Sequence, residues 1–449
     1  MGTAPPRPSF FEHLRLAARV NDLAWCLERT YRKFGPVSDV GYKPTIRVVY
    51  TVGPEANRYI LSEHTENFLW GPAFYLLEPT NGASGLVMTD GDEHRRLRRL
   101  MQPAFGIKRV DARLGIITEE MDAMLDRWTA GSSVDAYEEL RRATRRIVIR
   151  SLFGEEFSAR ADEIGEAFEP ALAYVGRTPM SRIDLDLPFL PYGKAMRSRE
   201  AIDRIVLDEI ARRRASGVDA DASPDTLSAL LVAADEVEGE VEPLTDAEIC
   251  DQVRSLIGAG YDTTSSSASW IVHALGANPH VFADLRTQVR DTIADRAPTV
   301  DDLRSMPLVD AVVRETLRLW PPGVVSGRIA VDDFDLHGFT IPSGSLVMYS
   351  PYLTHRLPEV WGDPQVFRPE RWADGEPEPF SFVPFGGGYR KCLGFALATL
   401  ELQLLTVRLA QRLTWENERT DPRGAGIANF APKGGLPITV TGGPVAVPA

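Results

Sequence analysis

Apolar residues recur at helical spacing along most of the chain, and this pattern predicts a mainly α-helical protein. Two segments depart from it. Arg47–Val52 (RVVYTV) is rich in β-branched and aromatic residues and predicts a strand, while Phe334–Ser350 mixes such residues with turn formers and predicts several short strands. We expect the helical portion over roughly residues 92–320 and 393–413, and a minor β region over roughly 36–60 and 328–350.

One long helix is predicted near the middle of the chain. Thr245 and Glu248 form a capping-box pattern at its start, and Asn278-Pro279 stops the apolar periodicity after Gly276. A helix of this length would extend about 45 Å. Its centre, Gly258–Ser267 (GAGYDTTSSS), consists of poor helix formers. A kink, a break and a local widening beside the acid and alcohol side chains are all compatible with this pattern.

Composition and charge narrow the class of protein. The chain has 449 residues with a formal net charge of −13, and 44% of its residues are hydrophobic, as in ordinary globular proteins. The acidic balance and the lack of a broad basic stripe disfavour nucleic-acid binding. The short polar stretch Ala215–Pro224 lies between helical patterns and is a poor candidate for a linker. We therefore expect a single domain over residues 1–449.

The cysteines and the N-terminal sequence indicate the cellular compartment in which the protein is expected. Cys26, Cys250 and Cys392 are odd in number and widely spaced, which disfavours a disulfide framework and favours a reducing compartment. The first residues lack the apolar core of a secretory signal, and no apolar run reaches the roughly 18 residues of a membrane span. We expect a soluble, cytoplasmic protein.

The most distinctive local pattern is the loop Pro384–Gly394 (PFGGGYRKCLG), which precedes the predicted helix Phe395–Leu413. Arg390, Lys391 and the helix N-terminus should lower the pKa of the Cys392 thiol and favour the thiolate. A buried, inert cysteine is the ordinary alternative. The loop offers no histidine base for a nucleophile and lacks the phosphate-loop spacing. A haem iron accepts a single cysteine thiolate, so a haem-ligand loop is favoured.

This loop resembles the haem-binding loop of the cytochrome P450 superfamily, of the soluble bacterial type. The matching residues are Phe385, Gly388, Arg390, Cys392 and Gly394, and Gly386 of the same loop is expected to bind the cofactor with them. Three further motifs occur in the family's order, and together the motifs extend from His94 to Gly394. The resemblance implies the P450 fold, haem b with Cys392 as the axial iron ligand, and O2 as co-substrate.

The resemblance also implies roles in the weak centre of the long helix. Ala259 and Gly260 would leave room above the haem. Thr263 would hydrogen-bond the dioxygen, and Asp262 would relay protons from solvent, which O–O cleavage requires.

Charged motifs acquire roles in the same way. The resemblance places haem propionates on His94, Arg98, Arg328 and Arg390. The resemblance also implies that Glu315, Arg318 and Arg371 form a buried structural network. The spacing of Glu315 and Arg318 alone is typical of a solvated ion pair on a helix. A basic face for an acidic electron donor would comprise Arg95, Arg96, Arg99 and Lys391, although a basic helix is usually just a solvated surface.

Taken together, these features predict a monooxygenase that hydroxylates or epoxidises a hydrophobic small molecule. A separate ferredoxin and ferredoxin reductase would donate the electrons, and the protein would be a monomer without nucleic-acid partners. The expected pocket residues are Phe74, Tyr75, Leu77, Leu86, Val87, Ile257, Val324, Val325 and Phe430. A peroxide-driven peroxygenase and a non-catalytic haem-binding protein remain alternatives. His355 has no assigned role, and no second metal is indicated.

Overall fold

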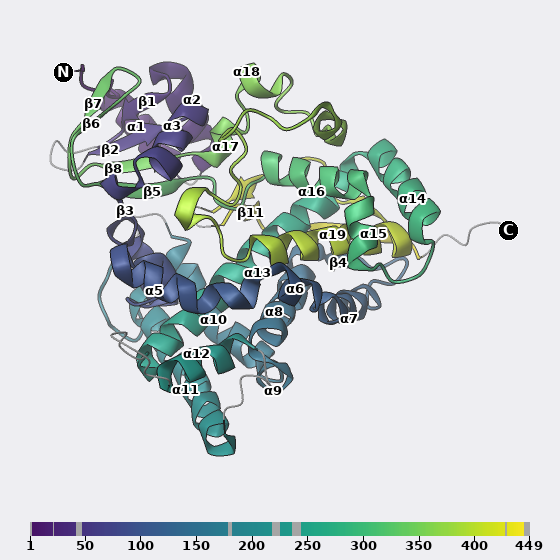
Figure 1. Ribbon diagram of the computed structural model, residues 1–449. Helices are drawn as coiled ribbons and strands as arrows, with labels where there is room; N and C mark the ends of the chain where they lie inside the picture. The colour runs from purple at the N-terminus through teal and green to yellow at the C-terminus, as the bar shows by residue number, and fades with distance from the viewer. Residues whose placement is uncertain are drawn as a thin grey trace.

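The computed structural model describes residues 2–20, 22–41, 47–177, 182–217, 225–235, 244–426 and 429–443. Helices dominate it, and the strands are few and short, so the prediction of a mainly α fold with a minor β region is confirmed. In Figure 1 the strands β1, β2, β3 and β5 to β8 gather with the first helices near the N-terminus, while β4 lies among the helices α5 to α16 and α19, which fill most of the rest of the molecule.

The α-helices of the first half are α1 (Phe10–Ala18), α2 (Leu23–Phe34), α3 (Pro54–Arg58), α4 (Glu78–Asn81), α5 (Gly91–Met101), α6 (Ile107–Asp111), α7 (Leu114–Leu125), α8 (Ala136–Phe153), α9 (Glu155–Ser158), α10 (Ala161–Val175) and α11 (Pro191–Ser216). Those of the second half are α12 (Thr226–Asp235), α13 (Asp246–Ala277), α14 (Pro279–Ile293), α15 (Val300–Ser305), α16 (Pro307–Leu319), α17 (Pro351–Thr354), α18 (Pro358–Trp361) and α19 (Phe395–Arg412). Short 3₁₀ or π turns are η1 (Tyr59–Glu63), η2 (Thr65–Asn67), η3 (Gly71–Leu77), η4 (Leu86–Met88), η5 (Gln102–Phe105), η7 (Pro369–Asp374) and η8 (Gly388–Arg390).

The main sheet has five strands in the order β1-β2-β8-β5-β3. These strands are β1 (Val37–Asp39), β2 (Val48–Thr51), β3 (Phe68–Leu69), β5 (Ser326–Ala330) and β8 (Leu346–Tyr349). Only β2 and β8 run parallel among them. The smaller sheets comprise β4 (Ser133–Asp135), β12 (Pro437–Gly442) and β9 (Thr414–Asn417), then β6 (Phe334–Leu336) with β7 (Phe339–Ile341), and β10 (Gly424–Ala425) with β11 (Ala431–Pro432).

The predicted long helix is α13, and both of its expected ends are correct to within one residue. Thr245 and Glu248 form the capping box, each side chain bonding the other residue's backbone N–H. The helix is continuous through its weak centre, so the alternative of a break is wrong. It packs closely on α8, where Gly260 faces Val148: a Cβ at Gly260 would lie 3.0 Å from the nearest valine methyl. A central element this well packed can support the weak helix formers within it.

Two other predictions bear on the architecture. The strands predicted in Arg47–Val52 and Phe334–Ser350 are present as β2 and β6 to β8. The stretch Ala215–Pro224 begins at the end of α11, and its residues 218–224 lie outside the described part of the chain. Among the described residues, no helix is long and apolar enough to cross a lipid bilayer.

Candidate active site

The cysteine loop is shaped by glycines. Gly386 and Gly388 have φ angles of 67° and 60°, in the left-handed region that favours glycine. A Cβ at Gly388 would overlap the carbonyl oxygen of Leu61 in η1. The backbone N–H of Cys392 donates to the carbonyl of Phe385 at 2.9 Å and closes the loop. α19 begins directly after Gly394, as predicted.

The environment of Cys392 differs from the prediction in one respect. Its side chain is accessible to solvent, yet burial raises the pKa of its thiol above the usual value. The residue thus keeps accessible surface while protein atoms desolvate its sulfur. The N–H of Gly394 and the charges of Arg98 and Lys391 act to lower that pKa, as expected, but they do not outweigh desolvation. The predicted net lowering of the thiol pKa is therefore wrong for the free thiol, although the charges act in the predicted direction.

The centre of α13 opens onto space at one point. Most of this helix is buried, whereas Ala259 is exposed. The hydroxyl of Thr263, one turn later, donates to the carbonyl of Ala259 at 2.7 Å. Accessible surface in the middle of a central helix indicates a cavity beside it. α19, which begins just after Cys392, packs against α13.

Asp262 lies beside this opening and is held by neighbouring elements. Burial raises the pKa of its carboxyl, and the nearby Arg141 of α8 acts to lower it. The Arg141 Nε lies 3.6 Å from Asp262 Oδ1, and the same guanidinium pairs with Glu169 of α10 at 3.0 Å. The side-chain amide of Asn429 donates to the Asp262 carbonyl at 2.9 Å. Asp262 is thus linked through Arg141 to a carboxylate that is half exposed.

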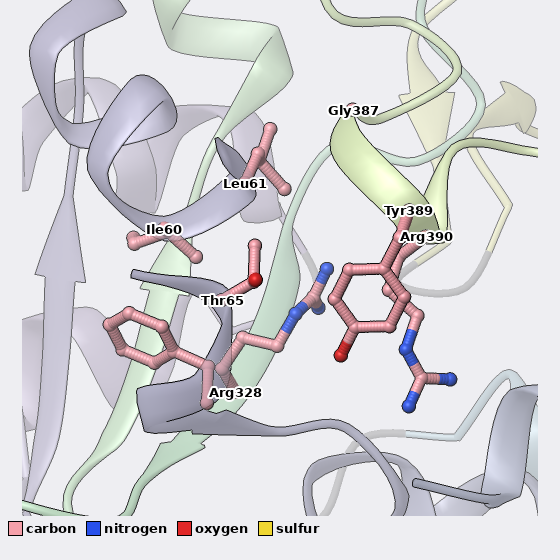
Figure 2. A pocket seen from close by; sticks show the side chains of 8 residues that line it. Ile60, Leu61, Thr65, Arg328, Gly387, Tyr389 and Arg390 are labelled. Carbon is pink, nitrogen blue, oxygen red and sulfur yellow. The ribbon is translucent and has the colours of Figure 1, made fainter. Parts of the chain in front are cut away.

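A buried cationic cluster lies between β5 and the cysteine loop. Arg328 is 3% exposed, and its guanidinium lies 3.5 Å from the ring centroid of Trp70. Its Nη1 donates to the Gly327 carbonyl at 2.6 Å, and burial lowers its pKa. Figure 2 shows Arg328 reaching from β5 toward Tyr389 and Arg390 of the loop, across a small pocket.

Arg390 is tied to the segment before α5. Its Nη2 donates to the Thr89 carbonyl at 2.7 Å and to Asp90 Oδ1 at 2.5 Å. The Asp90 carboxylate also accepts the backbone N–H groups of Trp70, at 2.8 Å, and Gly71, at 2.7 Å. Trp70 and Asp90 were not among the predicted site residues. The only signal for Asp90 was its position before a helix, and its side chain does not cap that helix.

Four polar atoms in this cluster are buried without a hydrogen-bond partner. They are Arg328 Nη2, Arg390 Nε, His94 Nδ1 and Trp70 Nε1. Burial, then the charges of Arg390, Arg98 and Arg95, lower the pKa of His94 to about 3, so its ring is neutral near pH 7. Buried donors without acceptors cost free energy, and an anionic ligand would satisfy them. The residues present therefore fit a haem whose propionates reach this cluster.

Arg98 has a different partner. Its Nη2 donates to the carbonyl of Lys391 at 2.8 Å, so it braces the cysteine loop directly. The Lys391 ammonium rests 3.9 Å from the ring centroid of Phe395 at the start of α19. Both contacts place positive charge next to Cys392.

The structure brings Glu315, Arg318 and Arg371 together in a buried network. Arg318 donates twice to the Glu315 carboxylate, at 2.8 and 2.9 Å, and Arg371 Nε donates to Glu315 Oε1 at 3.0 Å. Glu315 and Arg318 are fully buried. Trp372 Nε1 and the backbone N–H of Arg368 also donate to Glu315, which joins α16 to η7.

His355, unassigned from the sequence, is a fully buried connector. Its Nε2 accepts the N–H of Val383 at 2.9 Å, and its Nδ1 lies 3.3 Å from the carbonyl of Arg318. Burial and two nearby arginines lower its pKa to about 3. Nothing in the sequence around it distinguishes this histidine from a surface one.

Four predicted residues lie elsewhere than expected. Arg96 is largely buried and pairs with Glu93 and with Glu248 of α13, because it points toward α13 rather than toward the exposed face with Arg95 and Arg99. The other three, expected in the substrate pocket, are packed in the core: Ile257 at 0%, Val324 at 0% and Phe430 at 4% exposed. Phe430 stacks on Trp270 at a centroid distance of 6.0 Å.

The remaining predicted pocket residues keep accessible surface. Leu86, Val87, Leu77, Phe74 and Val325 are half-buried, and Tyr75 is 58% exposed. Among the described residues, no group of three or more histidine, cysteine, aspartate or glutamate side chains is placed to hold a metal ion.

Comparison with known proteins decides the family. The family model of cytochrome P450 matches residues 2–427. This chain belongs to the cytochrome P450 family. Its relatives include the "Putative cytochrome P450 139" of Mycobacterium tuberculosis, which is 34% identical over 91% of this chain and 96% of that protein. Like other members, it is a monooxygenase that uses haem iron and O2, and the family resemblance drawn from the cysteine loop is confirmed.

Named relatives and solved structures agree with this assignment. The pentalenene oxygenase of Streptomyces avermitilis is 32% identical, with 81% of each chain covered. The cyclooctat-9-en-7-ol 5-monooxygenase of Streptomyces melanosporofaciens is 31% identical over 73% of this chain and 72% of that protein. A retinoic acid bound cyanobacterial CYP120A1 structure superposes with a TM-score of 0.85 at 27% identity, covering 98% of this chain and 99% of the other.

Proposed function

We propose that this P450 oxidises a terpenoid-like hydrocarbon, by hydroxylation or epoxidation, with haem b ligated by Cys392 and electrons from a ferredoxin and its reductase. The observation that carries the proposal is the pairing of an accessible Cys392 with buried, unpartnered donors on Arg328 and Arg390. A thiolate and a set of carboxylate-binding arginines are what a haem requires at its iron and at its propionates. The relatives named for pentalenene and cyclooctat-9-en-7-ol support the substrate class.

The residues around the haem have separate tasks. Arg328, Arg390 and His94 bind the propionates, and Arg98 braces the loop that presents the sulfur. Bound haem supplies the activation of O2 and the transfer of one oxygen atom. Glu315 is the centre of a network that fixes the segment leading to the loop.

Proton handling falls to the centre of α13. The Thr263 hydroxyl faces the opening at Ala259, where it can donate to a ligand after giving up its bond to the helix carbonyl. Asp262 lies next to it, and burial raises the pKa of its carboxyl, a shift that favours its use as a proton carrier. Asp262→Asn and Thr263→Ala should each lower product formation by about 10²-fold while NADPH consumption persists.

The substrate space is apolar. Leu77, Leu86, Val87 and Val325 keep accessible surface, and Ala259 adds a small apolar wall. A hydrocarbon skeleton gains free energy from burial here without leaving polar groups unpaired.

The donor face retains three of its four predicted residues. Arg99 and Lys391 are exposed, and Arg95 is 60% exposed beside Asp92. On a protein with net charge −13, this local positive charge suits an acidic ferredoxin. Arg99→Glu should slow reduction by a ferredoxin, and Arg96→Gln should not, because Arg96 is held by Glu93 and Glu248.

The direct test is reconstitution. The haem-loaded protein is titrated with sesquiterpene and diterpene hydrocarbons, following loss of the iron-bound water by absorption, and binders are then incubated with ferredoxin, reductase, NADPH and O2. The proposal expects an oxygenated product from at least one binder. Equal turnover with hydrogen peroxide alone would indicate the peroxygenase, and binders that yield no product would indicate a haem-binding protein.

A further inference from the structure

A buried polar clasp joins the loop before η4 to the first half of α13. Asp251 is 5% exposed, and its Oδ2 accepts the backbone N–H of Ser84 at 2.9 Å and the Ser84 hydroxyl at 2.7 Å. The approach is so close that a Cβ at Gly82, whose φ is +71°, would overlap the Asp251 carboxylate. The loop can therefore reach α13 only with glycine at this position.

The next residue of α13 completes the clasp. Gln252 is fully buried, and both ends of its amide are used. Its Oε1 accepts the N–H of Leu86 at 2.9 Å, and its Nε2 donates to the carbonyl of Ser84 at 2.6 Å. Two consecutive side chains thus bind the backbone of Ser84 and Leu86 on both sides of Gly85. Side-chain to backbone bonds of this kind hold a loop whatever its own side chains are.

Charge ties the clasp to α11. The Asp251 carboxylate also accepts Arg199 Nη2 at 3.3 Å, and it pairs with the fully buried Arg254. Arg254 pairs in addition with Asp203, which lies one turn after Arg199 on α11. Since the acceptor is a carboxylate group with two cationic neighbours, its bonds to Ser84 belong to the stronger, charge-assisted kind.

The clasp lies on the same face of α13 as the proposed reaction site. Gln252, Ala259 and Thr263 are spaced by seven and then four residues, so they share one face of α13. Gln252 is about 10 Å along the helix from Ala259. The residues held by the clasp lead directly into η4, which carries Leu86 and Val87, both half-buried. The clasp therefore fixes the position of Leu86 and Val87, which form one apolar wall of the proposed substrate space.

We propose that Asp251 and Gln252 are positioning residues for substrate, which hold Leu86–Met88 in place from α13 and so limit the size of molecule that this end of the pocket accepts. This inference rests on the proposed function and concerns its selectivity. Neither residue is among those proposed to hold the haem or to move protons, and both act through the loop that they bind. Loosening the clasp should alter binding of bulky ligands while small ones bind as before.

The test uses the haem-loaded protein with two probes, imidazole and 4-phenylimidazole, whose binding shifts the haem absorption band. Gln252→Ala removes two bonds and is the main variant. Ser84→Ala removes one hydroxyl bond without exposing a buried charge, and serves if Gln252→Ala folds poorly. Gln403→Ala is the matched control, because Gln403 bonds Asp310 on α16, away from the loop.

Two readouts are expected to move together. Hydrogen exchange at the amide of Leu86 should become about tenfold faster in Gln252→Ala, because this variant removes the acceptor of that amide together with the bond to the Ser84 carbonyl. The ratio of the two dissociation constants should change about fivefold or more, with imidazole affinity within about twofold of the parent value. Gln403→Ala should leave both readouts unchanged.

Unchanged exchange, or faster exchange with an unchanged ratio, would overturn the inference. Imidazole that fails to shift the spectrum of the parent protein would instead overturn the proposed function, and exchange at Leu86 would still decide the clasp.

Discussion

Arg318 and His355 bond each other twice. The Arg318 guanidinium donates to the main-chain carbonyl of His355 at 2.8 Å, and His355 Nδ1 lies 3.3 Å from the main-chain carbonyl of Arg318. Because the N–H of Val383 donates to Nε2, the ring proton must be on Nδ1, which donates to Arg318. α16 is thereby linked to the segment that leads into the cysteine loop.

This arrangement makes stability depend on pH. The folded protein keeps His355 neutral with a pKa of about 3, whereas an unfolded histidine has a pKa of about 6.5. Below the unfolded value only the unfolded state takes up this proton, so the free energy of unfolding falls as pH drops toward the folded value. In His355→Gln the unfolded state takes up about one proton fewer. The slope of the free energy of unfolding against pH should therefore fall by about 1.4 kcal/mol per pH unit between roughly pH 4 and 6.

Urea unfolding at several pH values measures this slope. His280→Gln, an exposed change, is the control and should leave the slope unchanged. A His355→Gln protein with the parent's pH dependence would contradict the assignment of a neutral, buried ring.

The buried network should be costly to break. Glu315→Gln leaves Arg318 and Arg371 without their carboxylate in a dry environment, and we expect a loss of about 3–5 kcal/mol in the free energy of unfolding. Glu376→Gln is the matched control, because Glu376 pairs at the surface with Arg314 of the same helix α16, and its loss should cost about 0.5 kcal/mol or less. Denaturant unfolding gives both values. Equal losses in the two variants would show that the network adds little.

Alanine substitutions at two glycines can distinguish the cost of backbone strain from the cost of a steric clash. Gly388 and Gly362 have similar φ angles of 60° and 64°, but only Gly388 faces a neighbour, the Leu61 carbonyl. Gly362→Ala should cost about 1 kcal/mol through strain alone. Gly388→Ala should cost more and lower haem content, because the loop must shift away from η1. Unfolding curves and haem content per protein measure the difference, and identical results for both variants would disprove the close approach as the reason for glycine.

The cationic cluster makes a prediction about haem retention. Arg328→Met removes the buried donor that lacks a protein partner, so haem dissociation should accelerate by about tenfold or more. Arg304→Met, at an exposed arginine that pairs with Asp111, should leave it unchanged. Transfer of haem to apomyoglobin gives the rate. An unchanged rate in Arg328→Met would remove Arg328 from the propionate site.

The residues that could be predicted from sequence are those whose constraints are local. In the loop from Phe385 to Gly394 and at the capped start of helix α13, the residue types within a short stretch of sequence determine the backbone conformation. Asp90 could not be predicted, because its partner Arg390 lies 300 positions away in the chain.

Errors arose where burial decided the outcome. Local charges lower the pKa of the Cys392 thiol as expected, but desolvation raises it by more. Desolvation depends on which distant segments pack around the sulfur, and the residues next to Cys392 in the sequence do not reveal this. Val324 is apolar and near the site in sequence, yet it is buried in the core, and apolarity alone cannot separate a pocket wall from a core residue.

The central claim is that the sulfur of Cys392 ligates the haem iron, and the carbon monoxide difference spectrum of the reduced protein tests it most directly. The parent protein and Cys26→Ser, a change at a cysteine outside the loop, should both show the red-shifted band of a thiolate-ligated haem. Cys392→Ser should lose that band. A Cys392→Ser protein that retained it at full intensity would contradict the account.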